Sequence, residues 1–213
     1  MVVVPETDIA RVADAHERFL GAVRDLSDEH VRRRSLLPGW TVGHVLTHVA
    51  RNADSHVRRA EAAVRGEVVD QYEGGLAGRD ADIEAGAGRS AVEILDDVRR
   101  SARAVDDAWR ALPADAWTAR SRDANGRERP LFELPARRWQ EVEVHVVDID
   151  VGVTHRDWPE AFVLEWLPRT RERMWDRLPS QPIGLGFDDP RDELAWLYGR
   201  LRRDDLPKLS AWG

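Results

Sequence analysis

Three segments of this chain carry apolar side chains at the spacing of an amphipathic helix, with one apolar residue at every third or fourth position. Thr41 can cap the second segment, and Ser90 with Glu93 forms a capping box at the start of the third. Long helices of this kind cannot bury their apolar faces alone, so the sequence predicts a helical bundle. The predicted helices cover about 7–26, 41–66 and 90–112.

A fourth long element is expected between about 131 and 151, but its core, RWQEVEVHVVDIDVG at 138–152, allows two conformations. Its valines and isoleucine alternate with charged residues, which is the period of a half-buried strand. Glu141 and His145 are four residues apart. That spacing separates two residues by about 13 Å along a strand but by only about 6 Å on one face of a helix. Only the helix would let both side chains bind one metal ion.

Two regions between the predicted helices lack a helical period. Residues 67–88 contain five glycines and are predicted to form a long connection, of the kind that often lines a site. Residues 114–130 are polar and contain an Asn125-Gly126 turn.

The pattern changes after Gly152. A helix is expected over about 159–178, a short strand over PIGLGF at 182–187, and a second helix over 191–201. We therefore predict a mainly α protein with two domains. They are a four-helix bundle with one long crossover at 1–154 and a small α+β domain at 155–213.

Composition excludes several kinds of site. The chain has no cysteine, so disulfides, thiolate metal ligands and a protein thiol nucleophile are excluded. The net charge of −7 argues against nonspecific binding of nucleic acid. No apolar run reaches the roughly 18 residues of a membrane span, so no membrane partner and a cytoplasmic location are expected. Any metal ion must be bound by histidine, carboxylate or backbone groups.

Seven histidines are present, and two of them, His44 and His48, share one face of the second predicted helix. One ligand from that helix together with Glu141 and His145 would give three protein ligands and an open coordination position. That pattern is typical of catalytic zinc and not of structural zinc. The alternative is that these histidines lie on an ordinary polar face and that the Glu141 segment is a solvated sheet edge.

Several motifs resemble the mycothiol-dependent maleylpyruvate isomerases, a family of DinB-like metal-binding bundles. They include LLPGWTVGHVLTHVARNAD, GRSAVEILDDVRRSA, RRWQEVEVHVVDIDVG, DWPEAFV, AWLYGR and LPKLSAWG. The resemblance implies that 138–152 is helical and that zinc, or another divalent metal, is bound by His48, Glu141 and His145. It also implies that an arginine of the C-terminal domain, matched here by Arg200, faces the substrate.

The reaction implied by the resemblance is the cis–trans isomerisation of maleylpyruvate to fumarylpyruvate in gentisate breakdown, with mycothiol as the thiol that the chain itself lacks. Arg79 and Arg89 are candidates to bind the anionic cofactor or substrate. The partners expected are a small-molecule substrate and a low-molecular-weight thiol, in a monomer or small homo-oligomer. Two alternatives are a mycothiol S-transferase that conjugates the thiol to an electrophile, and a noncatalytic zinc-binding regulatory bundle.

The chain departs from the family pattern in two places. The stretch between Leu178 and Asp192 is shorter than expected, because the C-terminal domain of the family carries a fuller antiparallel sheet. Val146 stands where many relatives are expected to have a second histidine, which is not a ligand.

Overall fold

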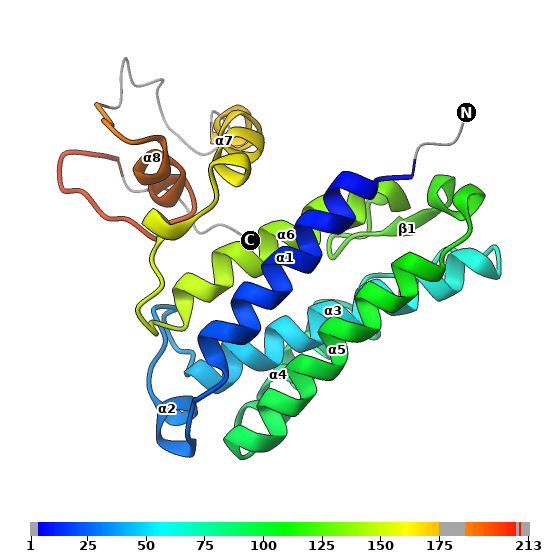
Figure 1. Ribbon diagram of the computed structural model, residues 1–213, viewed down its shortest axis with the longest axis horizontal. Coiled ribbons are helices and arrows are strands. Elements are labelled where there is room, and N and C mark those ends of the chain that lie inside the picture. The colour runs from blue at the N-terminus through cyan, green and yellow to red at the C-terminus, as the bar shows by residue number, and fades with distance from the viewer. Residues whose placement is uncertain (1–3, 175–185, 208, 210–213) are drawn as a thin grey trace.

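The computed structural model describes residues 4–174, 186–207 and 209, and within them it has eight α-helices and one two-stranded sheet (Figure 1). Four long helices form the bundle: α1 (Glu6–Val23), α3 (Val42–Val64), α5 (Ala91–Ala111) and α6 (Leu134–Asp148). Helices α1 and α3 each pack against both α5 and α6, which closes the bundle around one core. The predicted four-helix bundle is confirmed.

Both predicted caps are present. The Thr41 side chain accepts a hydrogen bond from the backbone N–H of His44 at the start of α3, and Ser90 and Glu93 form the capping box of α5. These bonds satisfy N–H groups that have no partner inside the helix. Local sequence therefore fixes where two of the four bundle helices begin.

Residues 138–148 of the ambiguous segment lie inside the helix α6, which confirms the helical prediction for them. The helix ends at Asp148, earlier than predicted, because Asp150 has a positive φ of 58°, so 149–152 are not helical. The valines Val142 and Val144 are buried, but so are the intervening Glu143 and His145. Helix α6 contacts α1 and α3, and residues of the C-terminal region cover another of its sides. Because α6 is enclosed on several sides, its charged residues are buried together with its valines. The alternation of valines with charged residues therefore does not indicate a strand here.

Residues 67–88 are not the extended connection that the glycines predicted, because Gly75–Ala87 form the helix α4. Several of these glycines allow close packing. A Cβ atom on Gly86 would lie 2.5 Å from Cγ2 of Thr47, and one on Gly43 of α3 would lie 2.4 Å from the carbonyl oxygen of Ala87. Helix α4 therefore lies against α3 at a distance that larger residues would not allow.

Two further small elements link the bundle helices. A five-residue helix, α2 (Asp28–Arg32), precedes α3 and was not expected from the sequence. Between α5 and α6, β1 (Arg120–Arg122) and β2 (Glu128–Pro130) form an antiparallel hairpin. Its connection contains the predicted turn at Asn125-Gly126, where Gly126 has φ +75°.

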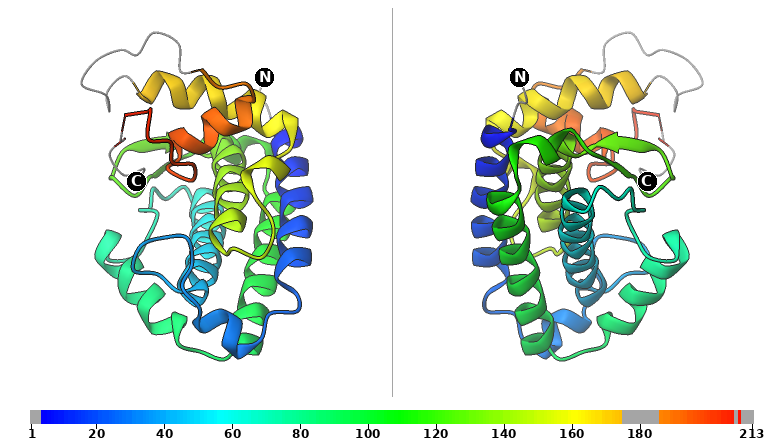
Figure 2. Two further views of the ribbon diagram at one scale, coloured as in Figure 1. Left: turned by 90° about the vertical axis from the view of Figure 1, so that its left-hand side faces the viewer. Right: turned by 90° about the vertical axis from the view of Figure 1, so that its right-hand side faces the viewer.

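The C-terminal region adds the short 3₁₀ helix η3 (His155–Asp157), α7 (Glu160–Met174) and α8 (Pro190–Leu197). Helices α7 and α8 run crosswise to the bundle helices (Figure 2). Aromatic residues continue the core from the bundle into this region, for example at Trp139 and Phe162, whose ring centroids are 5.3 Å apart. Most of the strand predicted at 182–187 lies outside the described residues.

The second predicted C-terminal helix ends earlier than expected, at Leu197, because the chain turns at Gly199 with φ +73°. The predicted domain boundary at 154 falls on Thr154, which caps η3. Throughout the part of the chain that the structure describes, no helix has both the length and the apolar character needed to cross a membrane.

Candidate metal centre

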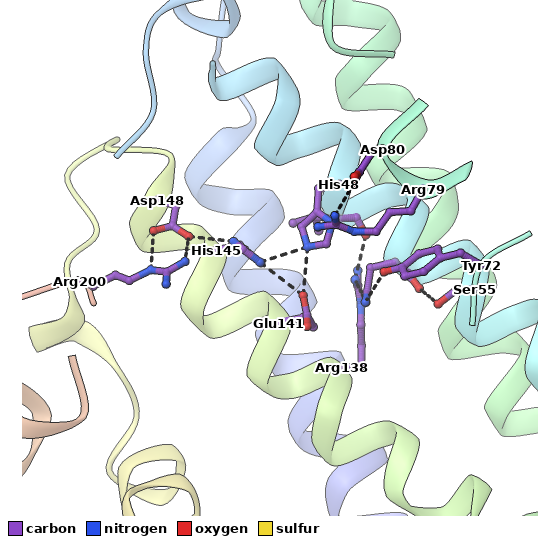
Figure 3. A network of polar contacts seen from close by, with 12 residues as sticks. His48, Ser55, Tyr72, Arg79, Asp80, Arg138, Glu141, His145, Asp148 and Arg200 are labelled. Carbon is purple, nitrogen blue, oxygen red and sulfur yellow. Dashed lines mark hydrogen bonds and ion pairs between the residues drawn. The ribbon is translucent and has the colours of Figure 1, made fainter. Parts of the chain in front are cut away.

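Helices α3 and α6 bring His48, Glu141 and His145 together in the interior of the bundle (Figure 3). The Nε2 atom of His48 lies 3.1 Å from Nε2 of His145 and 3.1 Å from Oε2 of Glu141. The third side of this triangle, from Nε2 of His145 to Oε2 of Glu141, is 3.4 Å. Three predicted ligand atoms thus converge on one point.

The triangle has the size that a metal ion requires. Zinc bonds to nitrogen and oxygen are about 2.0–2.1 Å long, so two ligand atoms in a tetrahedral site are roughly 3.3 Å apart. The three observed separations, 3.1, 3.1 and 3.4 Å, are close to that value. Two imidazoles and one carboxylate are also a donor set suited to zinc and similar divalent ions. The residues present therefore fit the metal that the resemblance implies.

The protonation of two of the three ligands, His48 and Glu141, also suits a cation. Burial lowers the pKa of His48 to about 4, so its ring is neutral at pH 7. Burial acts to raise the pKa of Glu141, but hydrogen bonds with His145 and His48 hold it well below its usual range. The site thus offers a carboxylate and a neutral imidazole, which are the forms that bind metal ions. Glu141 keeps 25% of its side chain exposed, against 5% for His48, so solvent reaches the site beside the carboxylate.

Asp148 orients His145 through Nδ1, the ring nitrogen that does not face the other two ligands. Its Oδ2 atom lies 2.8 Å from Nδ1 of His145, and the carboxylate has no exposed surface. A carboxylate on Nδ1 fixes the tautomer that leaves a lone pair on Nε2, and metal-binding histidines commonly have such a partner. Burial acts to lower the pKa of His145, but the hydrogen bonds with Asp148 and Glu141 raise it. The sequence analysis missed Asp148, although its place three residues after His145 on the same helix is a usable signal.

Arg200 reaches this group from the C-terminal region. Its Nε and Nη2 atoms donate to the two oxygens of Asp148 at 2.9 and 2.7 Å, and its side chain is 8% exposed. The guanidinium of Arg200 therefore faces Asp148, and the expectation that Arg200 faces the substrate stays a prediction.

A group of aromatic and cationic side chains covers His48. The rings of Trp40 and His48 have centroids 5.6 Å apart, and the guanidinium of Arg79 lies 5.7 Å from the ring centroid of Trp40 and 6.0 Å from that of Tyr72. Arg79 comes from α4, and its Nη2 is 3.4 Å from Nδ1 of His48. When Nε2 of His48 binds a metal, Nδ1 carries the hydrogen, and Arg79 is then a cationic neighbour and not a donor to that atom.

Arg138 lies one turn before Glu141 on α6 and forms hydrogen bonds with α1 and α3 next to the site. It is fully buried and donates to the carbonyl oxygen of Val49 at 2.8 Å, Oδ1 of Asn52 at 2.9 Å and Nε2 of His16 at 3.1 Å. Burial lowers the pKa of Arg138 to about 10, and the negative charge of Glu141 acts in the opposite direction. The sequence analysis did not single out this residue, because nothing in its spacing distinguishes it from the other arginines.

Arg89, the remaining predicted site residue, lies in a different cluster. Its Nη2 donates to Asp97 at 2.7 Å and its Nε donates to the carbonyl oxygen of Gly86 at 3.0 Å. Asp97 also binds Arg51 and Arg100, so this carboxylate of α5 joins α3 and the connection between α4 and α5. A role for Arg89 in binding the cofactor would require its ion pair with Asp97 to open.

Comparison with known proteins gives the family of this chain and two crystal structures with a similar fold. Residues 12–150 match the family model described as the mycothiol maleylpyruvate isomerase N-terminal domain. A crystal structure of the mycothiol-dependent maleylpyruvate isomerase with one histidine mutated to alanine has a TM-score of 0.87 at 21% identity. A crystal structure of the mycothiol-dependent maleylpyruvate isomerase has a TM-score of 0.82 at 23% identity. Each match covers 99% of this chain and 98% of the other. None of the curated proteins shows significant sequence similarity.

Proposed function

We propose that this chain, which belongs to the mycothiol maleylpyruvate isomerase family, is a zinc enzyme that uses mycothiol to isomerise maleylpyruvate or a close analogue. The observation that carries the proposal is the triangle of His48, Glu141 and His145, with sides close to those of a tetrahedral zinc site. Three protein ligands leave a coordination position for another molecule, as in catalytic zinc sites.

The chain supplies the metal ligands and the surrounding charge. A divalent ion at this site would stabilise a thiol as its thiolate and polarise a carbonyl oxygen. Arg79 lies beside His48 and offers a cation to a carboxylate of the substrate. The ring centroids of Trp40 and Tyr72 lie 5.7 and 6.0 Å from that guanidinium, and Asp80 is its ion-pair partner at 2.6 Å, so a substrate carboxylate would replace Asp80 there.

The proposed reaction needs a nucleophile, because rotation about a carbon–carbon double bond is otherwise blocked. The thiolate sulfur of mycothiol forms a bond to one alkene carbon, and the π electron pair moves to the conjugated carbonyl oxygen. The former double bond is then single and rotates. Reverse electron flow breaks the carbon–sulfur bond, so the trans alkene forms and the thiol is regenerated. The absence of cysteine in the chain requires that this sulfur come from a separate molecule.

The test is a spectrophotometric assay with purified protein, zinc, mycothiol and maleylpyruvate. We expect the cis compound to disappear only when mycothiol is present, and the Glu141→Gln variant to lose this activity because a ligand charge is removed. Loss of the cis compound without thiol, or no loss with it, would refute the isomerase proposal. A stable thiol conjugate formed from another electrophile would instead assign the protein as a mycothiol S-transferase.

A further inference from the structure

The interaction between Arg200 and Asp148 connects the C-terminal region to the metal centre. Asp148 is the last residue of α6, and its Oδ2 atom is shared between Nδ1 of His145 and Nη2 of Arg200. The order of contacts is therefore Arg200, Asp148, His145 and then the site that a metal would occupy (Figure 3).

Asp148 alone would be a poor orienting group. Its side chain has no exposed surface, and a buried carboxylate without compensating charge is strongly disfavoured. Arg200 supplies that charge through a bidentate pair, with Nε on one oxygen and Nη2 on the other. This pairing fixes the plane of the carboxylate as well as its charge. It thereby fixes the direction in which Oδ2 meets the ring of His145.

The chain also fixes Arg200 itself. Its Nη1 donates to the carbonyl oxygen of Tyr198, and Gly199 between them adopts the left-handed φ of +73°. The hydroxyl of Tyr198 accepts a hydrogen bond from Gln140 of α6 at 2.7 Å. The segment that carries Arg200 is thus attached to the same helix that carries Glu141 and His145.

We infer that Arg200 is a positioning residue of the metal centre, which holds Asp148 so that Asp148 holds His145 for the metal. The inference rests on the proposed metal site, and it differs from a role in which Arg200 binds the substrate carboxylate. It makes the C-terminal region a determinant of the metal affinity of the bundle. A substrate-binding arginine would instead leave metal affinity unchanged.

The test is a competition titration of zinc against a chromophoric chelator, without substrate or thiol. We expect Asp148→Asn to weaken zinc binding about 10–100-fold, the usual effect of losing a partner of a metal-binding histidine. Arg200→Gln should weaken it about tenfold, because Asp148 then loses its compensating charge. Arg200→Lys should fall between Arg200→Gln and the wild type, because lysine keeps the charge but not the bidentate geometry. The matched control is Arg203→Gln, which removes an exposed ion pair with Asp205 in the same segment and should bind zinc as the wild type does.

A second measurement separates the two roles of Arg200. At saturating zinc, the inference predicts that the KM of Arg200→Gln for the anionic substrate changes by less than about threefold. Wild-type zinc affinity together with a KM raised more than about tenfold would overturn the inference and make Arg200 a substrate-binding residue. If circular dichroism shows that Arg200→Gln does not fold, Arg200→Lys is measured in its place. Weakened zinc binding by Arg200→Lys would support the inference, and wild-type zinc affinity would overturn it.

The outcome is distinguishable from failure of the proposed function. Weakened zinc binding in the variants without mycothiol-dependent turnover in the wild type would support the inference and refute the function. Turnover in the wild type with unchanged zinc binding in both Arg200 variants would support the proposed function and refute the inference about Arg200.

Discussion

Replacing Gly43 by alanine tests how α4 is held against α3. A Cβ atom at this position would lie 2.4 Å from the carbonyl oxygen of Ala87 and 3.2 Å from that of Val31. Both neighbours are backbone atoms, so neither can rotate away. Real Cβ contacts essentially never fall below 3.0 Å, so Ala87 must retreat by at least 3.0 − 2.4 = 0.6 Å. Helix α4, which carries Arg79, must move with it or distort.

The expected cost follows from overpacking. An extra methyl group in a well-packed interior destabilises a protein by about 1–3 kcal/mol. Exchanging glycine for alanine in a helix stabilises it by up to about 1 kcal/mol and so offsets part of that cost. A contact of 2.4 Å with backbone places the cost of the methyl group in the upper half of its range, about 2–3 kcal/mol, so Gly43→Ala should lower the free energy of unfolding by about 1–2 kcal/mol. Gly21→Ala is the matched control, because Gly21 is an exposed helical glycine and a Cβ atom added there would meet nothing within 4 Å. It should raise the free energy of unfolding by about 0.5–1 kcal/mol.

Thermal unfolding followed by circular dichroism measures the difference. For a chain of this size, 1 kcal/mol corresponds to a change in Tm of about 2–4 °C. The two variants should therefore differ by about 1.5–3 kcal/mol, or roughly 3–12 °C, with Gly43→Ala the less stable. Equal Tm values for the two variants would refute the reasoning that α4 packs against α3 through a required glycine.

Three further predictions concern the site and its surroundings. His48→Ala and Glu141→Ala should each lose stoichiometric zinc, measured by elemental analysis after gel filtration; zinc retained by both would refute the ligand assignment. Arg79→Ala should raise KM for the dianionic substrate about 10–100-fold while zinc content stays at one per chain, because a charged hydrogen bond is lost; Arg89→Ala, whose ion pair with Asp97 lies elsewhere, should leave KM unchanged. Burial holds the pKa of His56 well below its usual value near 6.5, so its stabilising contribution is present above pH 6.5 and is lost as pH falls. Urea titrations at pH 6.5 and 5 should show the wild type losing more stability than His56→Leu, by at most roughly 2 kcal/mol for one proton over this interval, and equal losses would contradict this assignment.

The sequence predicted the bundle because three segments carry strong local signals for helix. Capping residues at Thr41 and Ser90 were read correctly, since a cap depends only on neighbouring residues. The family suggested by the motifs is confirmed by the match over 12–150. The convergence of Glu141 and His145 followed from their spacing once the segment was taken as a helix, whereas the choice of His48 over His44 depended on the resemblance.

Other features could not be predicted from local sequence patterns. Helix α4 was missed because glycine is a weak helix former, and the contact of Gly86 with Thr47 of α3 is shown only by the folded structure. The bidentate pair of Arg200 with Asp148 joins residues 52 positions apart, and no local rule brings them together. The buried position of Arg138 likewise depends on the packing of α1, α3 and α6 around it.

The most direct test of the central claim is X-ray absorption at the zinc edge, measured on the loaded protein before and after addition of mycothiol. The account predicts nitrogen and oxygen ligands at about 2.0–2.1 Å with an imidazole contribution, and a new sulfur ligand at about 2.3 Å when the thiol is added. The chain has no cysteine, so a thiolate signal can only come from the added thiol. An unchanged spectrum on adding mycothiol, or zinc that His145→Ala still binds with the same ligand set, would contradict the account.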